Sequence, residues 1–447
     1  MKILFVSLGC DKNLVDSEMM IGMLAQKGYS FTDDETEAEV VVVNTCCFIN
    51  DAKEESINTL LEMAELRKSG QLKALVAAGC LAQRYREEIQ KEIPEVDVII
   101  GTTAIDEIVK AVEEALGEQE RRSNHYRDIN AAPVHGKKRV VTTGGHFAYL
   151  KIAEGCDKHC TYCIIPKVRG NYRSVPMESL VEEAEYLAEG GVKELILVAQ
   201  ETTLYGVDLY GKKSLPELLH KLCAIPGLVW IRLLYCYPEE IDEELIRVIK
   251  EEPKICHYLD MPIQHAADSV LKRMGRRTNQ LKLREIIAKL RKEIPDICLR
   301  TTLITGFPGE TQEDYEELYR FVNEMEFDRL GVFAYSREED TPAAGMEYQV
   351  EEEIKQNRRE ELMELQQAIA FEKAENRIGS VMTVMIEGRA VEEEVYVART
   401  YMDAPNVDGY LFLRTNAQLL SGDFARVFVT DSNEYDLIGE ITHEFTE

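Results

Sequence analysis

Three cysteines on one short loop constrain the fold of this chain more than any other feature. Cys156, Cys160 and Cys163 have the spacing C-x3-C-x2-C and directly follow an extended run from Phe147 to Ala153. Thiolates at this spacing can bind three irons of a cubane cluster, which leaves the fourth iron open for a substrate. A cluster that only carries electrons normally has four thiolate ligands. The open position therefore indicates chemistry at the cluster, as it does in catalytic metal sites.

A zinc loop and three unrelated thiols are the alternative interpretations of this motif. Zinc sites of this kind usually combine two C-x2-C pairs, and no second pair follows Cys163. We therefore interpret the loop as the binding site of a [4Fe-4S] cluster.

The loop resembles the signature of radical S-adenosylmethionine enzymes. In that family the open iron chelates the amino and carboxylate groups of S-adenosylmethionine. Reduction then cleaves the sulfonium and gives a 5′-deoxyadenosyl radical. The family usually has an aromatic residue before the third cysteine, near the adenine, and Tyr162 occupies that position. The resemblance implies S-adenosylmethionine as a cofactor; the cysteine spacing alone indicates only the open cluster.

Residues 1–117 alternate short apolar runs with helical patterns. This alternation predicts a doubly wound parallel α/β domain, with helices covering both faces of the sheet. Strands are expected at 2–8, 39–44, 72–78 and 96–100, and helices at 16–27, 52–69, 85–92 and 105–116.

One cysteine follows each of the first three expected strands. Cys10, Cys46 and Cys80 lie just beyond these carboxyl ends, which share one rim of a parallel sheet where ligands bind. Three cysteines without a role are the alternative, because cysteine is often buried. Their common structural position favours a second cluster with three thiolate ligands. Cys47 is adjacent to Cys46 and is expected to point elsewhere.

This half of the chain resembles the amino-terminal domain of methylthiotransferases, which carry an auxiliary iron–sulfur cluster. The matching stretches are GCDKNLVDSE at 9–18, NTCCFI at 44–49 and AGCLAQR at 78–84. The resemblance implies two [4Fe-4S] clusters in one chain.

Residues 147–350 repeat the alternation of strands and helices after a segment, 118–146, that is expected to be a linker. A partial parallel (β/α) barrel is predicted here, similar to a TIM barrel, with the active site at the carboxyl ends of its strands. Its strands are expected at 148–153, 193–199, 229–235, 257–261, 297–305 and 329–335.

Polar residues follow several of these expected strands. By the same family resemblance, the loops that carry Gln200 and Gln264 line the cofactor pocket. Arg300 lies near the start of its strand and could bind a carboxylate by a bidentate contact. His159 and His265 are interpreted as neighbours of the cluster or of the substrate, since histidine is an uncommon cluster ligand.

The last hundred residues change their pattern. Residues 351–378 predict an amphipathic bracing helix, with Ile354 and Leu362 on its apolar side. Residues 379–447 contain five short strands with turns between them, which predict a small antiparallel β-barrel. This part resembles the TRAM domain, which ends many methylthiotransferases and often binds RNA.

Overall charge and cysteine content indicate a cytoplasmic protein that does not coat nucleic acid. The net charge is −29, which opposes binding to a phosphate backbone. The eleven cysteines form motif-like clusters rather than a disulfide framework, so a reducing compartment is expected. No apolar run approaches the roughly 20 residues that span a bilayer, so no membrane contact is expected.

The resemblance implies methylthio transfer that consumes two molecules of S-adenosylmethionine, one as methyl donor and one as radical source. Two substrate branches compete: C2 of an adenosine in transfer RNA, and C3 of an aspartate in ribosomal protein S12. The terminal barrel has four arginines against thirteen acidic residues, and a net charge this negative favours a basic partner.

The first motif also resembles the ribosomal-protein branch, which has Lys-Asn where the transfer-RNA branch usually has Met-Asn. Lys12 and Asn13 occupy these positions, although Asp11 replaces a usual proline and Val175 a usual arginine. We therefore expect a basic ribosomal protein as substrate, an electron donor such as flavodoxin or ferredoxin, and no direct binding of transfer RNA. An electron-transfer or cluster-carrier protein, which would not cleave the cofactor, is the alternative from another class.

Overall fold

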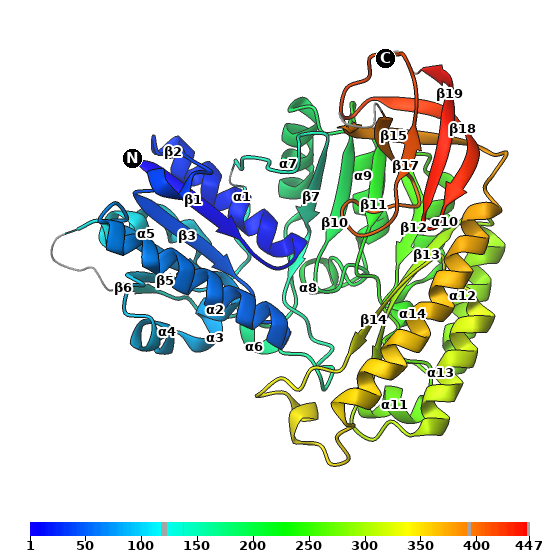
Figure 1. Cartoon of the computed structure of the whole chain (residues 1–447), viewed down its shortest axis with the longest axis horizontal. Helices are drawn as coiled ribbons and strands as arrows, with labels where there is room; N and C mark the ends of the chain where they lie inside the picture. The colour runs from blue at the N-terminus through cyan, green and yellow to red at the C-terminus, as the bar shows by residue number, and fades with distance from the viewer. Residues whose placement is uncertain (118–122, 137, 391–394, 445–447) are drawn as a thin grey trace.

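Two parallel sheets lie side by side, and a small barrel packs on the second (Figure 1). The computed structural model describes residues 1–117, 123–136, 138–390 and 395–444. None of the helices in this described part has the length and apolar content that a membrane span requires.

The amino-terminal sheet has the parallel order β2-β1-β3-β4-β5-β6. Its strands are β1 Lys2–Ser7, β2 Ser30–Phe31, β3 Val40–Thr45, β4 Ala74–Ala78, β5 Val98–Ile100 and β6 Ser123–His125. Its α-helices are α1 Asp11–Gln26, α2 Asn50–Glu65, α3 Gly79–Tyr85, α4 Glu87–Glu92 and α5 Ile108–Ala115.

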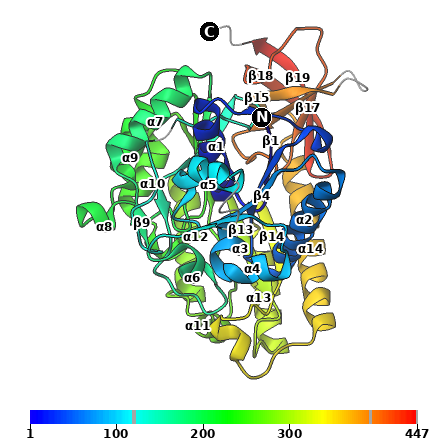
Figure 2. The ribbon, with the colours of Figure 1, turned by 90° about the vertical axis from the view of Figure 1, so that its left-hand side faces the viewer.

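Alternation along β3 explains why helices cover both faces of this sheet. Val40 and Val42 pack in one apolar cluster with side chains of α1 and α5, whereas Val41 and Val43 pack with Leu60 of α2. Buried β-branched residues on both sides suit a central parallel strand. Figure 2 shows α1 and α5 on one side of the sheet and α2 on the other.

Three local predictions in this domain were wrong. Helix α1 begins at Asp11 rather than at residue 16, with Cys10 as its N-cap. Helix α3 begins at Gly79, so Cys80 lies in a helical turn. The expected linker contributes the edge strand β6, and its Arg139 is fully buried against Glu18 and Glu183 at 2.8 and 3.0 Å. Lys137 of the same segment lies outside the described residues.

The core sheet has six parallel strands in the order β14-β13-β12-β11-β10-β7. Because it is open at β7 and β14, it forms the predicted partial barrel. Its strands are β7 Phe147–Lys151, β10 Glu194–Val198, β11 Trp230–Leu233, β12 Ile255–Asp260, β13 Cys298–Thr305 and β14 Arg329–Ala334, and a small antiparallel pair joins β8 Ala153–Glu154 to β9 Arg173–Ser174.

Helices pack on the outer face of this sheet, where they share one apolar cluster with the strands. The longer ones are α7 Met177–Glu189, α9 Leu215–Cys223, α10 Glu243–Glu251, α12 Gln280–Glu293 and α13 Gln312–Met325. Short helices lie at α6 Ile165–Arg169, α8 Val207–Tyr210 and α11 Asp268–Arg273. A second apolar cluster joins the inner face to both α1 and the terminal barrel.

Helix α14, Glu352–Glu375, connects the core to the barrel. Leu362 is fully buried against the core, and Phe371 packs edge-on against Tyr435 of the barrel, with ring centroids 5.2 Å apart. Ile354 was expected on the apolar side but is 43% exposed, because it lies in the first turn of the helix.

The terminal barrel is closed in the order β15-β16-β17-β19-β18. Its pairs are antiparallel except for β17 and β19, which are parallel. Its strands are β15 Val381–Ala390, β16 Val395–Thr400, β17 Leu411–Leu413, β18 Phe424–Asn433 and β19 Asp436–Glu444.

Candidate active site between the two sheets

The cysteine loop of the core follows β7 and β8 and is held by backbone hydrogen bonds. Cys156 N donates to Gly170 O at 3.1 Å, and Thr161 N donates to Met274 O at 2.9 Å. Gly155 has φ +77°, and a Cβ there would lie 2.0 Å from the carbonyl oxygen of Asn171. Only glycine therefore fits this turn.

Burial disfavours the thiolate form of Cys156 and Cys163 when no metal compensates its charge. It raises the pKa of Cys156 to about 12, and burial and the neighbouring Cys160 raise the pKa of Cys163. A bound metal supplies the positive charge that a buried thiolate needs. The donor set therefore fits an iron–sulfur cluster.

The other three cysteines meet at the carboxyl rim of the amino-terminal sheet. Cys10 follows β1, Cys46 follows β3, and Cys80 is the second residue of α3 after β4. A Cβ on Gly9 would lie 2.7 Å from the Cβ of Cys46. Burial raises the pKa of Cys46 and, more strongly, that of Cys80, with charges on the other cysteines adding to both shifts.

This second trio is positioned by a network around Asn13. The Asn13 Nδ2 donates to Leu8 O at 2.9 Å and to Thr45 O at 3.0 Å, which ties the loop after β1 to the end of β3. Its Oδ1 lies 3.8 Å from the Cys80 Sγ. Cys47 is buried in the same apolar cluster as Cys80, beside Arg84, and burial raises its pKa to about 11.

The structure thus brings each cysteine trio together, while iron binding by either trio stays a prediction. Among the described residues, no three His, Cys, Asp or Glu side chains are placed to bind one metal ion. This arrangement is compatible with a cubane, because each of its thiolates binds a different iron.

A buried arginine joins the two cysteine sites. Arg169 ends α6, which follows the core cysteine loop, and is 1% exposed. Its Nε lies 3.3 Å from the Cys80 Sγ, and its Nη2 donates to Asn13 Oδ1. Its Nη1 donates to Asp16 at 2.7 Å and to Glu154 at 3.2 Å.

Lys151 completes this charge cluster. Its Nζ pairs with Asp16 and, at 2.8 Å, with Glu154. Burial alone would raise the pKa of Glu154, but the charges of Arg169 and Lys151 outweigh burial and hold it at about 2. No sequence pattern predicted this charge cluster, because the residue types of buried and exposed charges are the same.

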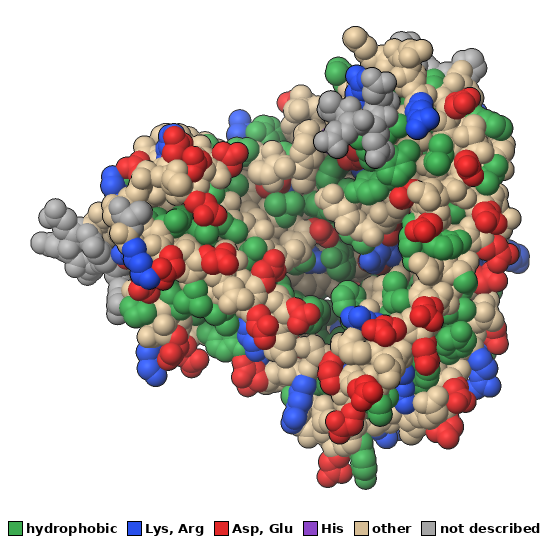
Figure 3. Space-filling view, in the orientation of Figure 1, with side chains coloured by type: hydrophobic (Ala, Val, Ile, Leu, Met, Phe, Trp, Pro, Cys, Tyr) green, Lys and Arg blue, Asp and Glu red, His purple; other side chains and the backbone are tan. Residues whose placement is uncertain are grey.

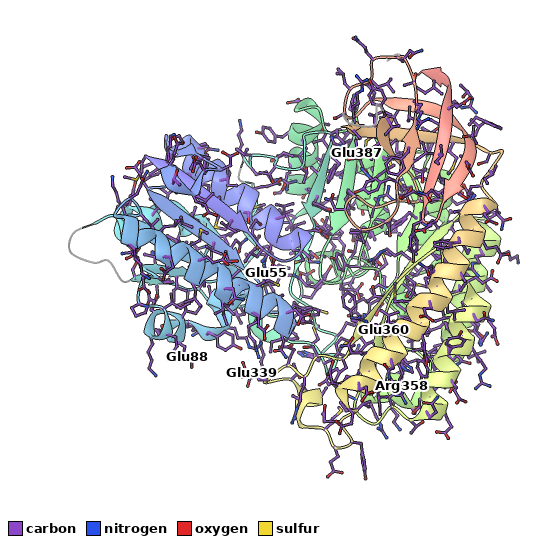
Figure 4. The ribbon with its side chains drawn as sticks, viewed as in Figure 1. Glu55, Glu88, Glu339, Arg358, Glu360 and Glu387 are labelled. Carbon is purple, nitrogen blue, oxygen red and sulfur yellow. The ribbon has the colours of Figure 1, made fainter. Side chains whose placement is uncertain are left out.

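A loop after β14, residues 336–348, crosses from the core to the amino-terminal domain. The Arg84 Nη2 donates to the carbonyl oxygen of Glu339 at 2.6 Å, and the Tyr85 hydroxyl donates to its carboxylate. Ala343 N donates to Thr161 O in the cysteine loop at 2.9 Å. Figure 4 shows Glu339 at the foot of the amino-terminal lobe. Figure 3 shows a hollow between the two lobes above this loop.

Three of the predicted cofactor residues lie at the rim of the core sheet, on or near the cysteine loop. Tyr162 packs edge-on against Phe307, with centroids 6.4 Å apart. The Gln200 Nε2 donates to Glu154 Oε1 at 3.1 Å, while the Gln200 Oε1 is buried and has no hydrogen-bond partner within the described ranges. Gln264 has φ +71°. Their contact with the cofactor stays a prediction.

Arg300, the fourth, already binds carboxylates of the protein. Its Nη1 donates to Asp260 at 2.9 Å, and its Nε lies 3.5 Å from Asp408 of the barrel. The predicted carboxylate contact is therefore formed within the chain.

Further polar groups at this rim fit a polar cofactor. Glu201 is fully buried, and burial raises its pKa to about 7. Its Oε2 has no hydrogen-bond partner among the residues that the structure describes. Lys158 of the cysteine loop lies 3.7 Å from it. Arg276 is also buried, and its Nε and Nη1 have no hydrogen-bond partner in the described part of the chain. Buried polar groups that lack hydrogen-bond partners indicate that a polar ligand binds beside them.

The two histidines differ in their surroundings. His159 lies exposed on the cysteine loop at φ +52°. His265 is fully buried; its Nδ1 accepts from Ala267 N at 3.0 Å, and its Nε2 lies 3.3 Å from Glu310. His265 therefore supports its own loop.

Comparisons with known proteins first define the class. Three family profiles match the chain: the uncharacterized protein family UPF0004 at 2–101, the radical SAM superfamily at 150–322 and the TRAM domain at 378–442. The solved structure of the radical S-adenosylmethionine methyltransferase TsrM from Kitasatospora setae, with cobalamin and a [4Fe-4S] cluster bound, matches with a TM-score of 0.54 and 16% identity over 76% of each chain. At that identity the likeness supports the fold alone. The profile and the fold together define a radical SAM enzyme.

Curated relatives define the family more closely. The ribosomal protein uS12 methylthiotransferase RimO of Lachnoclostridium phytofermentans is 64% identical over 98% of this chain and 99% of its own length. The proteins of the same name from Acetivibrio thermocellus and Geobacter sulfurreducens are 49% and 48% identical, each over at least 98% of both chains. The chain belongs to the RimO family of radical SAM methylthiotransferases.

Proposed function

We propose that this protein adds a methylthio group to C3 of an aspartate in ribosomal protein S12. The observation that carries the proposal is the pairing of two cysteine trios at facing sheet rims, joined by Arg169. Sulfur insertion at an unactivated carbon needs a radical source and a sulfur donor at the same substrate atom. Residues 147–350 would provide the first, residues 1–117 the second, and residues 379–447 would support substrate binding.

Six cysteines would hold the metal groups that this reaction needs. Cys156, Cys160 and Cys163 would hold a [4Fe-4S] cluster with S-adenosylmethionine, and Cys10, Cys46 and Cys80 an auxiliary [4Fe-4S] cluster. When bound, these groups and two molecules of S-adenosylmethionine supply the substrate radical and the methylated sulfur. The protein itself positions both sites, because the network of Arg169 and Asn13 fixes the amino-terminal rim against the core.

The electrostatic argument for a basic partner changes with the structure. Arg399 and Asp403 of the barrel are buried and paired with the core residues Glu194 and Arg329. Among the described barrel residues, the most exposed charges are Arg389, Arg414 and Arg426 against Asp431, Glu434 and Glu440, and the acidic Asp423 and Asp436 are half-buried. Acidic residues 392–394 and 447 lie outside the described residues.

The charge on the barrel surface therefore supports a basic protein substrate less strongly than the residue counts of the barrel indicated. The choice rests instead on the relatives, whose printed names specify ribosomal protein uS12, and on the net charge of −29. The same names do not favour adenosine C2 of transfer RNA. We infer a cytoplasmic reaction supported by an electron donor such as flavodoxin or ferredoxin.

The test is a competition between the two substrate classes. The anaerobically reconstituted enzyme is incubated with reductant, S-adenosylmethionine, ribosomal protein S12 and transfer RNA, and both macromolecules are then weighed. We expect the ribosomal protein to gain one methylthio group on an aspartate-containing peptide and 5′-deoxyadenosine to form. A gain on the RNA alone contradicts the substrate choice, and redox cycling without 5′-deoxyadenosine contradicts the enzyme class.

A further inference from the structure

Lys12 is a buried cation in the space between the two cysteine sites. It lies two residues after Cys10, in the first turn of α1, and is 5% exposed. Its Nζ stands 3.2 Å from the centroid of the Tyr235 ring. In the described part of the chain, this ammonium has no hydrogen-bond acceptor within 3.5 Å and no carboxylate oxygen within 4.0 Å.

Four other buried or half-buried cations that the structure describes around this rim are paired with carboxylates. Lys151 and Arg169 share Asp16 and Glu154. Lys158 pairs with Glu240, and Arg300 with Asp260. Removing an ammonium from water is costly unless a negative partner replaces the lost hydration, and an aromatic face replaces only part of it. Lys12 is therefore available to bind an anionic group of a ligand.

Tyr235 fixes the position of this ammonium. It follows the carboxyl end of β11 at φ +60°, which turns the chain over the rim of the core sheet. Its hydroxyl donates to Asp11 Oδ2 at 3.1 Å, and its backbone N donates to Asp260 at 3.0 Å. Asp11 and Asp260 are thus both hydrogen-bonded to Tyr235, whose ring contacts the Lys12 ammonium.

We propose that Lys12 binds the side-chain carboxylate of the aspartate that is modified, an inference that rests on the proposed function. The β-carbon of an aspartate is bonded directly to its carboxylate carbon. An ammonium that holds this carboxylate beside Cys10 therefore places the β-carbon between the sulfur-handling rim and the core. A neutral amide offers no such charge, so asparagine binds more weakly.

The test compares two forms of the substrate on the wild-type enzyme and three variants. Ribosomal protein S12 is prepared with aspartate or asparagine at the residue that gains the methylthio group. Binding to the full-length reconstituted protein is measured by isothermal titration calorimetry. Lys12→Met removes the charge and keeps the stem, Lys12→Arg keeps the charge, and Lys27→Met changes a 56%-exposed lysine just after the same helix.

We expect the wild type and Lys27→Met to bind the aspartate form roughly 100-fold more tightly than the asparagine form. Lys12→Met reduces this ratio to about one, and Lys12→Arg restores part of it. An iron content equal to that of the wild type shows that each variant is folded and loaded. The inference is overturned if Lys12→Met keeps the ratio of the wild type, or if the wild type methylthiolates the ribosomal protein yet binds both forms equally. Modification of RNA alone overturns the inference together with the proposed function.

Discussion

Replacing Arg169 with leucine removes the residue that joins the two halves of the site. The guanidinium is buried and contacts Cys80, Asn13, Asp16 and Glu154 at once. Its loss leaves two buried carboxylates with a single cation, Lys151. Breaking a buried ion pair by removing one partner costs about 3–5 kcal/mol. We expect Arg169→Leu to destabilise the folded chain by this amount at pH 7.

The same network predicts how this loss depends on pH. The pKa of Glu154 is about 2 in the folded protein, below its usual value of 4.5. A carboxyl with a lowered pKa stabilises the fold above its unfolded pKa, and this stabilisation disappears as pH falls toward the folded pKa. The difference between the wild type and Arg169→Leu should therefore be full above about pH 5 and shrink toward pH 2.

Urea denaturation of the apoprotein at several pH values measures both effects. The first unfolding transition is the relevant one, because a chain of several domains need not unfold in one step. Arg247→Leu is the matched control, since the Arg247 side chain is 56% exposed and forms an exposed ion pair with Glu251 at i+4; such a pair contributes about 0.5 kcal/mol. An unfolding free energy of Arg169→Leu within about 1 kcal/mol of that of the wild type at pH 7 would refute the reasoning.

Three further predictions follow from the packing and burial of the two sites. Gly9→Ala should lose the iron of the amino-terminal site, because the new Cβ would lie 2.7 Å from the Cβ of Cys46; full iron content in this variant contradicts the packing. Arg399→Leu should lower the unfolding free energy by about 3 kcal/mol, since it removes a buried partner of Glu194; a change no larger than that of an exposed arginine contradicts it. Iron loading should strengthen from pH 6 to pH 9, because burial raises the pKa of Cys156 to about 12 and metal binding releases thiol protons; loading independent of pH contradicts this account.

The sequence was sufficient to place the cysteines at the correct ends of the correct strands. Apolar runs such as residues 40–43 identify central parallel strands, and the carboxyl ends of these strands necessarily share a rim. Both the expected fold class and the family were confirmed. The short edge strands β2 and β6 were missed, because two or three residues without apolar alternation carry no signal.

Charged residues were the main source of error. Arg169 and Lys151 connect the two parts of the site through buried ion pairs. Nothing in their sequence context distinguishes them from exposed charged residues. The barrel residues Arg399 and Asp403 were counted as surface charge, although both pair with the core. Long-range ion pairs depend on the docking of separate domains, which a single sequence does not show.

Iron analysis with cysteine variants tests the central claim most directly. Two trios that each hold a cubane predict about eight irons per chain after anaerobic reconstitution. Changing Cys10, Cys46 and Cys80 to alanine should leave about four, and changing Cys156, Cys160 and Cys163 should also leave about four. Retention of all eight irons in either triple variant would contradict the assignment of the two sites.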